Sequence, residues 1–292
     1  TSMIHYLKNI YSDLSGFERI ACIYKEAKDL FADDCIVDFS RCSFFEANMA
    51  SPLAAVLAKI ADDFNNVKII NIPGKIATIL RKNGFLKLYG FPGLYDQNET
   101  TVPFRRIRKA DQGLFEEYLN RHLKGKGLPE MTAKLDRAFK QSVFEVFQNA
   151  VMHADSDSGI FVCGQFYPHK KKLDLTISDA GVGIRDNVRH YFKNQKISSV
   201  EAIRWAMREG NTTKSGAQPG GLGLKLLRDF IEQNNGRIQI ASRLGFFEFQ
   251  TGTETFSRMS ADFPGTAVNL EINTADPSSY CLTEEISPDN FF

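Results

Sequence analysis

Between residues 16 and 88 the apolar positions switch repeatedly from helical spacing to short continuous runs. The pattern predicts a helix over residues 17–31, a buried strand at residues 35–39 and a second strand at residues 67–72. Further helices are predicted after each of these strands. The alternation of strand and helix is typical of an α/β domain.

Two helix boundaries in this region are marked by specific residues. Ser51 and Pro52 would supply an N-cap and a first-turn proline for a helix whose apolar residues recur at three- and four-residue steps. A shorter helix over residues 75–82 is expected to stop at Asn83-Gly84, because glycine and asparagine tolerate the left-handed conformation that ends helices.

The pattern changes between residues 90 and 103, which are rich in glycine, proline and polar residues. We therefore predict a domain over residues 1–95, a linker or lead-in segment over 96–130 and a second domain over 131–292. The second domain is predicted to be an α+β sandwich, with helices on one face of a mixed sheet. Its predicted elements are a helix over 131–154, strands at 161–167, 173–178, 237–242 and 266–272, and a helix that begins near Gly223.

Composition narrows the class of protein without naming a partner. The 36 basic residues nearly balance the 35 acidic residues, and 43% of the chain is hydrophobic. This is typical of a globular protein and argues against a nucleic-acid-binding module. No run is long and apolar enough for a membrane helix, so we expect a cytoplasmic protein without a membrane partner. Five widely spaced cysteines without a CxxC pair are expected to be reduced core residues.

A polar face lies along the predicted helix over residues 131–154. Glu145, Asn149 and His153 recur at four-residue steps, which places their side chains on one face. A carboxylate and a carboxamide one turn apart could hold a divalent cation and an attacking water, because Mg²⁺ takes oxygen ligands and keeps several waters. A solvated helix face is the alternative interpretation. The opposite face is apolar and suits packing on a sheet: Phe139, Val143, Val146, Phe147 and Ala150.

Two glycine-rich segments follow. In SDAGVGI, Asp179 would stand at the end of an apolar strand, and Gly181 and Gly183 would let the backbone pass close to a planar base or a phosphate. GGLGLKLL, residues 220–227, is a glycine-rich turn that runs into a helix, where backbone N–H groups and the helix dipole favour an anion. Taken singly, each segment could be an ordinary turn that allows close packing.

In this order and spacing, the three motifs resemble the N, G1 and G2 boxes of the GHKL superfamily, which includes DNA gyrase B subunits, heat-shock chaperone ATPases, mismatch-repair proteins, histidine kinases and anti-sigma-factor kinases. EVFQNAVMH, residues 145–153, is similar to the N box. The resemblance covers about residues 131 to 273 and implies a Bergerat fold that binds ATP with Mg²⁺.

The resemblance also implies a role for each matching residue. Glu145 would be the catalytic residue that activates the attacking water, and Asn149 would coordinate Mg²⁺. Asp179 would accept a hydrogen bond from the adenine amino group, and Thr266 would support adenine through Asp179 and water. The glycines that would shape the nucleotide pocket are Gly181, Gly183, Gly221 and Gly223.

The segment between the last two boxes, residues 185–219, is expected to be the ATP lid. Its polar end contains Thr213 and Lys214, which could reach the phosphates once the lid closes. An exposed loop is the alternative interpretation of this end. Trp205 is expected to pack with Ile203 and Met207 inside the lid rather than to stack on a base.

Residues 15–90 resemble a STAS domain, the fold of anti-anti-sigma factors. The order of helix, strand and loop is similar, but Asn48 stands where the family carries a phosphorylatable serine, and Glu46 replaces the usual aspartate. Without a hydroxyl at this position, the loop is expected to bind a partner rather than to be phosphorylated. Ser51 lies nearby but is assigned to the helix cap.

Two functions follow from these motifs. The first is an ATP-binding regulatory protein of the anti-sigma-factor-kinase type, in which Mg²⁺-dependent hydrolysis or phosphotransfer to an unidentified partner protein is coupled to the STAS-like domain. The second is a non-catalytic, ATP-sensing interaction module. The sequence leaves open whether the site is that of a hydrolase or a serine/threonine kinase, and whether the protein forms a homodimer.

Overall fold

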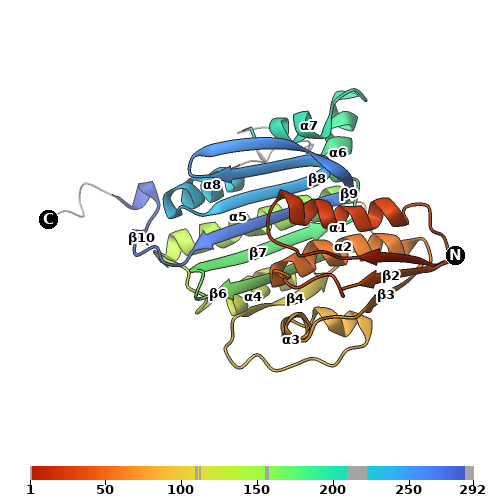
Figure 1. The fold of residues 1–292 in the computed structure, drawn as a ribbon. Coiled ribbons are helices and arrows are strands. Elements are labelled where there is room, and N and C mark those ends of the chain that lie inside the picture. Colours follow the sequence, from red (N-terminus) through yellow and green to blue (C-terminus); the bar gives the residue numbers. More distant parts are fainter. Residues whose placement is uncertain (1, 109–110, 112, 155–157, 209–221, 287–292) are drawn as a thin grey trace.

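The computed structural model describes residues 2–108, 111, 113–154, 158–208 and 222–286 (Figure 1). For residues 147–154 and 222–224 it describes the backbone only. Within these ranges no helix combines the length and the apolar character needed to cross a membrane.

The N-terminal half contains a parallel three-stranded sheet in the order β1-β2-β3. The predicted alternation of strand and helix is confirmed, with a first strand that the pattern analysis missed. The strands are β1 (Met3–Tyr6), β2 (Asp34–Asp38) and β3 (Asn66–Ile70). The helices are α1 (Leu14–Ala27), α2 (Ala50–Asp62) and α3 (Gly74–Lys82), with short 3-10 helices η1 (Ala47–Met49) and η2 (Phe85–Tyr89).

The second half is built on a five-stranded sheet in the order β4-β6-β7-β9-β8. Its neighbouring strands are all antiparallel, which differs from the mixed sheet expected, because hairpins join β6 to β7 and β8 to β9. The strands are β4 (Thr101–Ile107), β6 (Ile160–Tyr167), β7 (Lys172–Asp179), β8 (Arg237–Gln250) and β9 (Thr253–Asn273). A short parallel pair, β5 (Glu130–Met131) and β10 (Ser279–Tyr280), lies outside it.

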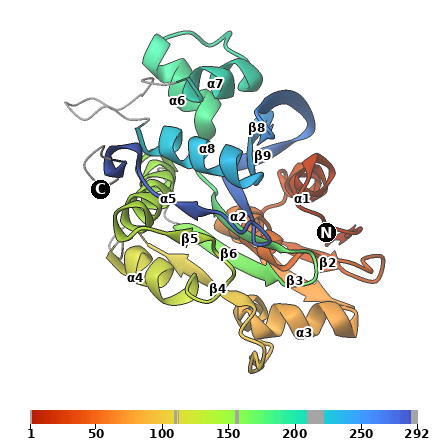
Figure 2. The same ribbon diagram turned by 90° about the vertical axis from the view of Figure 1, so that its left-hand side faces the viewer.

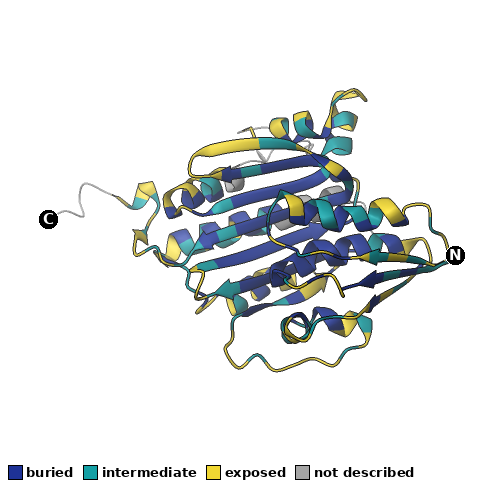
Figure 3. Cartoon of the chain, viewed as in Figure 1, coloured by how far each residue is buried: buried dark blue, intermediate teal, exposed yellow. Residues whose placement is uncertain are grey.

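Both faces of the five-stranded sheet are covered. Helices α4 (Gly113–His122), α5 (Ala133–Ala154) and α8 (Leu222–Asn234) lie on one face, and α1 and α2 lie on the other (Figure 2). Alternation along β6 serves both layers, since Val162 packs with the first set of helices and Phe161 with the second. The sheet is therefore buried along most of its length (Figure 3).

The segment over residues 96–130, expected to be a linker or lead-in, contributes to this sheet. It contains α4 and the edge strand β4, which pairs with β6 through a register shift between Val102 and Arg105. Pro103 lies within that shift. Proline and the irregular pairing weaken the period-two pattern, and edge strands at bulges tolerate both.

The first helix, predicted over residues 17–31, begins and ends three to four residues earlier as α1. The boundaries of α2 and α3 were predicted from specific residues. Pro52 does lie in the first turn, and α3 does end at Lys82, followed by Asn83 and by Gly84 in the left-handed conformation. The prediction that Ser51 caps α2 was wrong, because the helix already begins at Ala50. The Ser51 hydroxyl is fully buried, donates to the Phe161 carbonyl at 2.9 Å and lies 2.8 Å from the Ser178 hydroxyl, with which it shares a hydrogen bond.

Asn48, at the STAS-like loop position, is also fully buried between the two halves. Its Nδ2 donates to Ser12 Oγ at 2.9 Å and to Thr176 Oγ1 at 3.1 Å, and its Oδ1 accepts from the Tyr167 hydroxyl at 3.2 Å. The carboxamide donates two hydrogen bonds and accepts one here, whereas a serine hydroxyl has only one proton to donate. The loop thus packs against the five-stranded sheet.

The cysteines are all free, but the prediction of core positions holds only in part. Cys35, Cys42 and Cys163 are buried, Cys22 is half-buried, and Cys281 is exposed.

We predict that Asn48→Ala lowers the free energy of unfolding by about 1–3 kcal/mol, because it removes one hydrogen-bond donor each from the buried hydroxyls of Ser12 and Thr176. Urea unfolding followed by circular dichroism measures this. The matched control is Asn98→Ala, an exposed loop position where the same truncation should change stability by less than about 0.5 kcal/mol. Equal effects of the two substitutions would contradict the buried polar contact.

Candidate nucleotide site

Asp179 is the last residue of β7 and is only 2% exposed. Across the β7–β9 ladder it pairs with Thr266. Its Oδ1 accepts a hydrogen bond from the backbone N–H of Gly181 at 2.7 Å, which closes a tight turn after the strand. The structure thus brings three of the predicted site residues together.

Burial raises the pKa of the Asp179 carboxyl to about 7, and the N–H groups of Gly181 and Thr266 offset only part of this effect. A carboxyl group has two oxygens and about four acceptor positions, so these two donors leave room for a ligand donor. The site therefore offers a buried, pre-oriented acceptor, as recognition of an exocyclic amine requires.

Ser242 is a site residue that the sequence analysis missed. Its Oγ donates to the Gly265 carbonyl at 2.9 Å, accepts from the Ile184 N–H at 2.9 Å and lies 3.0 Å from Thr266 Oγ1. One hydroxyl therefore ties β8, β9 and the start of α6 (Gly183–Phe192) together beside Asp179. The serine carries no motif of its own, and only the pairing of Ser242 with Thr266 across β8 and β9 reveals it.

Two glycines allow the backbone segments around Asp179 to pack closely. Gly265, with φ +116°, lies so near the end of β7 that an added Cβ would come within 2.3 Å of the Asp179 carbonyl oxygen. Gly183, with φ +80°, packs against Ser242 and Arg243, and a Cβ there would lie 2.9 Å from the Arg243 side chain. Both positions combine positive φ with close contacts, so a larger residue would displace the strands around Asp179.

Helix α5 carries the predicted N-box residues. Phe139, Val143 and Val146 are buried against the sheet, which confirms the described part of the predicted apolar stripe. Glu145 is half-buried beside this stripe. Asn149 follows one turn later on the same helix, and its side chain, like that of His153, lies outside the described residues.

The third motif is seen only where its helix begins. Helix α8 starts at Leu222, directly after the predicted glycine turn, and contains Gly223. Gly221, Thr213 and Lys214 lie outside the described residues. The predicted contacts of these residues with phosphate stay predictions.

The described part of the predicted lid, residues 185–208, contains most of α6 and all of α7 (Ser199–Ala206). Ile203 and Met207 are buried in the core beneath the sheet helices, and not in a lid cluster with Trp205 as expected. Trp205 packs instead on Tyr191 and Phe192 of α6, with ring centroids 5.5 and 5.2 Å away. These aromatic contacts join the two lid helices.

Residues 135–268 match the family model of histidine kinase-, DNA gyrase B-, and HSP90-like ATPases. This match supports the GHKL assignment for the second half of the chain and ATP as its ligand. The matched range contains all of the predicted site residues. A search of curated proteins found no match. The STAS resemblance of the N-terminal half stays a prediction.

The residues of the region that matches the family model are compatible with a nucleotide-bound Mg²⁺. Among the described residues, no group of three or more histidine, cysteine or acidic side chains could hold a metal ion. A nucleotide-bound Mg²⁺ does not need such a group, because phosphates and waters supply most of its ligands. The oxygen-bearing side chains one turn apart on α5, Glu145 and Asn149, are of the kind that Mg²⁺ accepts.

The raised pKa of Asp179 predicts a specific pH dependence of stability. Its ordinary pKa of 3.8 lies below the folded-state value, so the folded protein holds this proton more tightly than the unfolded chain. Stability attributable to Asp179 should therefore fall as the pH rises from about 4 to about 7 and stay constant above that. Relative to Asp179→Asn, which stays neutral, the wild type should lose about 2.5 kcal/mol between pH 5 and pH 8.

Urea unfolding of both proteins without nucleotide at several pH values measures this difference. Taking the difference cancels the titration of other groups, including Asp174. A difference that is independent of pH would contradict the raised pKa.

Proposed function

We propose that this protein is an ATP-dependent regulatory protein that hydrolyses ATP, or passes its γ-phosphoryl group to a partner protein. The observation that carries the proposal is the buried Asp179, held by Gly181 and paired with Thr266 inside the matched ATPase region. In this proposal the Asp179 carboxyl accepts a hydrogen bond from the adenine amino group, and Thr266 supports the same contact.

Glu145 would then act as the general base. Its place on α5, one turn before Asn149, lets one residue accept the proton of the attacking water while the other helps to hold Mg²⁺. Bound Mg²⁺ would spread the negative charge that develops on the phosphates. Thr213, Lys214, Gly221 and Gly223 are proposed to contact the phosphates from the lid and the glycine turn.

The N-terminal half is proposed to couple the nucleotide site to a regulatory partner. Thr176 and Ser178 of β7 face this half and bond to Asn48 and Ser51, whereas Asp179 is the next residue of the same strand. A shift of β7 or of the turn after it would therefore move both Asp179 and the contacts with the N-terminal half. A GHKL kinase and a GHKL hydrolase would use this arrangement equally well.

The alternative function is an ATP-sensing module without catalysis. It would give saturable ATP binding with neither phosphate release nor phosphotransfer. The half-buried carboxylate at position 145 favours the catalytic proposal.

We predict that Asp179→Ala abolishes ATP binding, with a loss in affinity of at least about a hundredfold, because the buried acceptor for adenine is removed. Isothermal titration calorimetry with ATP and Mg²⁺ measures it. The control variant is Asp111→Ala, an exposed acidic position outside the matched range. Undiminished affinity in the Asp179 variant would overturn the site assignment.

We predict that Glu145→Ala retains ATP binding and loses turnover by about a hundredfold or more, because a positioned base contributes that much to proton transfer. A phosphate-release assay and a phosphotransfer assay, run beside calorimetry, separate the two effects. Glu117→Ala, on the exposed side of α4, serves as the matched control. If Glu145→Ala hydrolyses ATP at the wild-type rate, Glu145 is not the base.

A further inference from the structure

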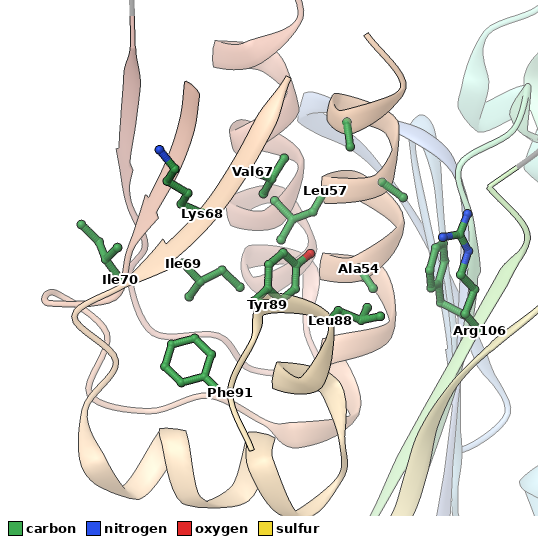
Figure 4. Close-up of a pocket in the computed structure, with 13 residues that line it drawn as sticks. Ala54, Leu57, Val67, Lys68, Ile69, Ile70, Leu88, Tyr89, Phe91 and Arg106 are labelled. Carbon is green, nitrogen blue, oxygen red and sulfur yellow. The ribbon is translucent and has the colours of Figure 1, made fainter. Parts of the chain in front are cut away.

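A pocket of about 620 Å³ lies between the N-terminal sheet and the edge of the five-stranded sheet, away from Asp179 (Figure 4). One of its walls consists of four consecutive residues of β3, residues 67–70. Successive side chains of a strand point to opposite faces, so four in a row can line one space only along the strand's edge. The pocket is therefore a groove beside an edge strand.

The edge of β3 that faces the groove is not paired with any strand of the described chain. In the order β1-β2-β3, only β2 pairs with β3. The hydrogen bonds toward the β2 side use Asn66, whose N–H donates to the Asp33 carbonyl, and Ile70, whose carbonyl accepts from the Phe39 N–H. Because backbone groups alternate in direction along a strand, those of Val67 and Ile69 point into the groove.

The floor of the groove is one face of α2, formed by Ala54, Leu57, Ala58 and Ala61. These residues recur at helical spacing, and three of them are alanines that leave space above the helix for another backbone. Tyr89 and Phe91 close one end, and their rings lie beside Leu57 and Ile69 (Figure 4). The lining would take apolar side chains from a segment laid along β3.

The groove also has a polarity. Arg106, on the opposite wall, lies over the Phe161 ring with 5.6 Å between the guanidinium carbon and the ring centroid. Its Nε donates to the Ser158 carbonyl at 2.5 Å, and none of the described residues that line the groove carries a carboxylate. The Lys68 ammonium pairs with the Asp34 carboxylate at 2.8 Å, so it does not compete with Arg106 for an anionic ligand. The fork geometry of arginine favours a carboxylate at this end.

We propose that this groove binds an extended peptide segment of another protein as an added strand on the free edge of β3. Its alternate side chains would be apolar and lie on α2, and an acidic side chain or a C-terminal carboxylate would meet Arg106. A small amphipathic molecule could satisfy the apolar lining and Arg106 but would leave the backbone groups of Val67 and Ile69 unused. The groove lies apart from the nucleotide site, so the inference does not require that ATP is turned over.

The test uses random decapeptides displayed on phage and selected on the full-length chain. The enriched peptides should share alternating apolar residues and an acidic group. A synthetic peptide of this kind is then measured by fluorescence polarisation against the wild type, Ala58→Trp, which fills the groove, and Arg106→Gln. Each substitution should weaken binding by about tenfold or more. The charge-matched control Lys28→Gln, at the exposed C-cap of α1 and outside the lining of the groove, should bind as the wild type does.

A second form of the same peptide, N-methylated at alternate residues, distinguishes strand addition from simple apolar burial. Loss of binding on N-methylation in one of the two alternate patterns supports strand pairing. The proposal is overturned if no peptide is enriched, if neither groove variant weakens binding, or if both N-methylated forms bind as the parent does. Binding of decanoate to the wild type in place of any peptide would assign the groove to a small amphipathic ligand instead.

Discussion

The central strand β7 must satisfy two layers at once, and the rest of the molecule is arranged around this constraint. It pairs with β6 on one side and with β9 on the other. Its residues Leu175 and Ile177 face α5 and α8, the helices of the region that matches the family model. Its alternate residues Asp174, Thr176 and Ser178 are polar and fully buried. Because buried polar groups without partners are strongly unfavourable, the second layer has to supply hydrogen bonds as well as apolar cover.

The N-terminal half supplies partners for Thr176 and Ser178 from a short stretch of chain, whereas Asp174 accepts from Asn269 of β9 at 3.2 Å. Asn48 bonds to Thr176, Ser51 bonds to Ser178, and Glu46 reaches Lys172 at 3.1 Å. The STAS-like loop thus serves as an internal contact in this protein. Its position against the sheet explains why Asn48 and Ser51 are buried rather than presented to another molecule.

Charge reinforces the same junction. The Lys172 ammonium lies 2.9 Å from Asp174 and 3.2 Å from Glu271, in addition to Glu46. Burial alone would lower the pKa of Lys172, but the three carboxylates raise it. Burial raises the pKa of Asp174 to about 7, with Lys172 acting in the opposite direction. Removing Lys172 would leave the buried Asp174 without its cation, whereas Glu271 would keep Arg237 at 2.7 Å and Glu46 would keep Lys170 at 3.5 Å. Breaking a buried ion pair on one side in this way is strongly unfavourable.

The sequence by itself determined the features that depend on neighbouring residues. The apolar stripe of α5, the stop at Asn83-Gly84 and the turn after Asp179 follow from helical spacing and glycine conformation, which act over a few residues. The motifs that resemble GHKL boxes could be recognised for the same reason, because each lies within a few consecutive residues. The roles of Asn149, Thr213 and Lys214 rest on the sequence alone.

Only the tertiary structure decided which distant residues meet. The pairing of Asp179 with Thr266, the hydroxyl of Ser242 beside them and the burial of Ser51 all depend on strand register and on the contact between the two halves. The edge strand β4, which contains Pro103, carries too weak a pattern to be recognised without its partner β6. Local propensity cannot encode such contacts, because their free energy comes from burying groups that lie far apart in the chain.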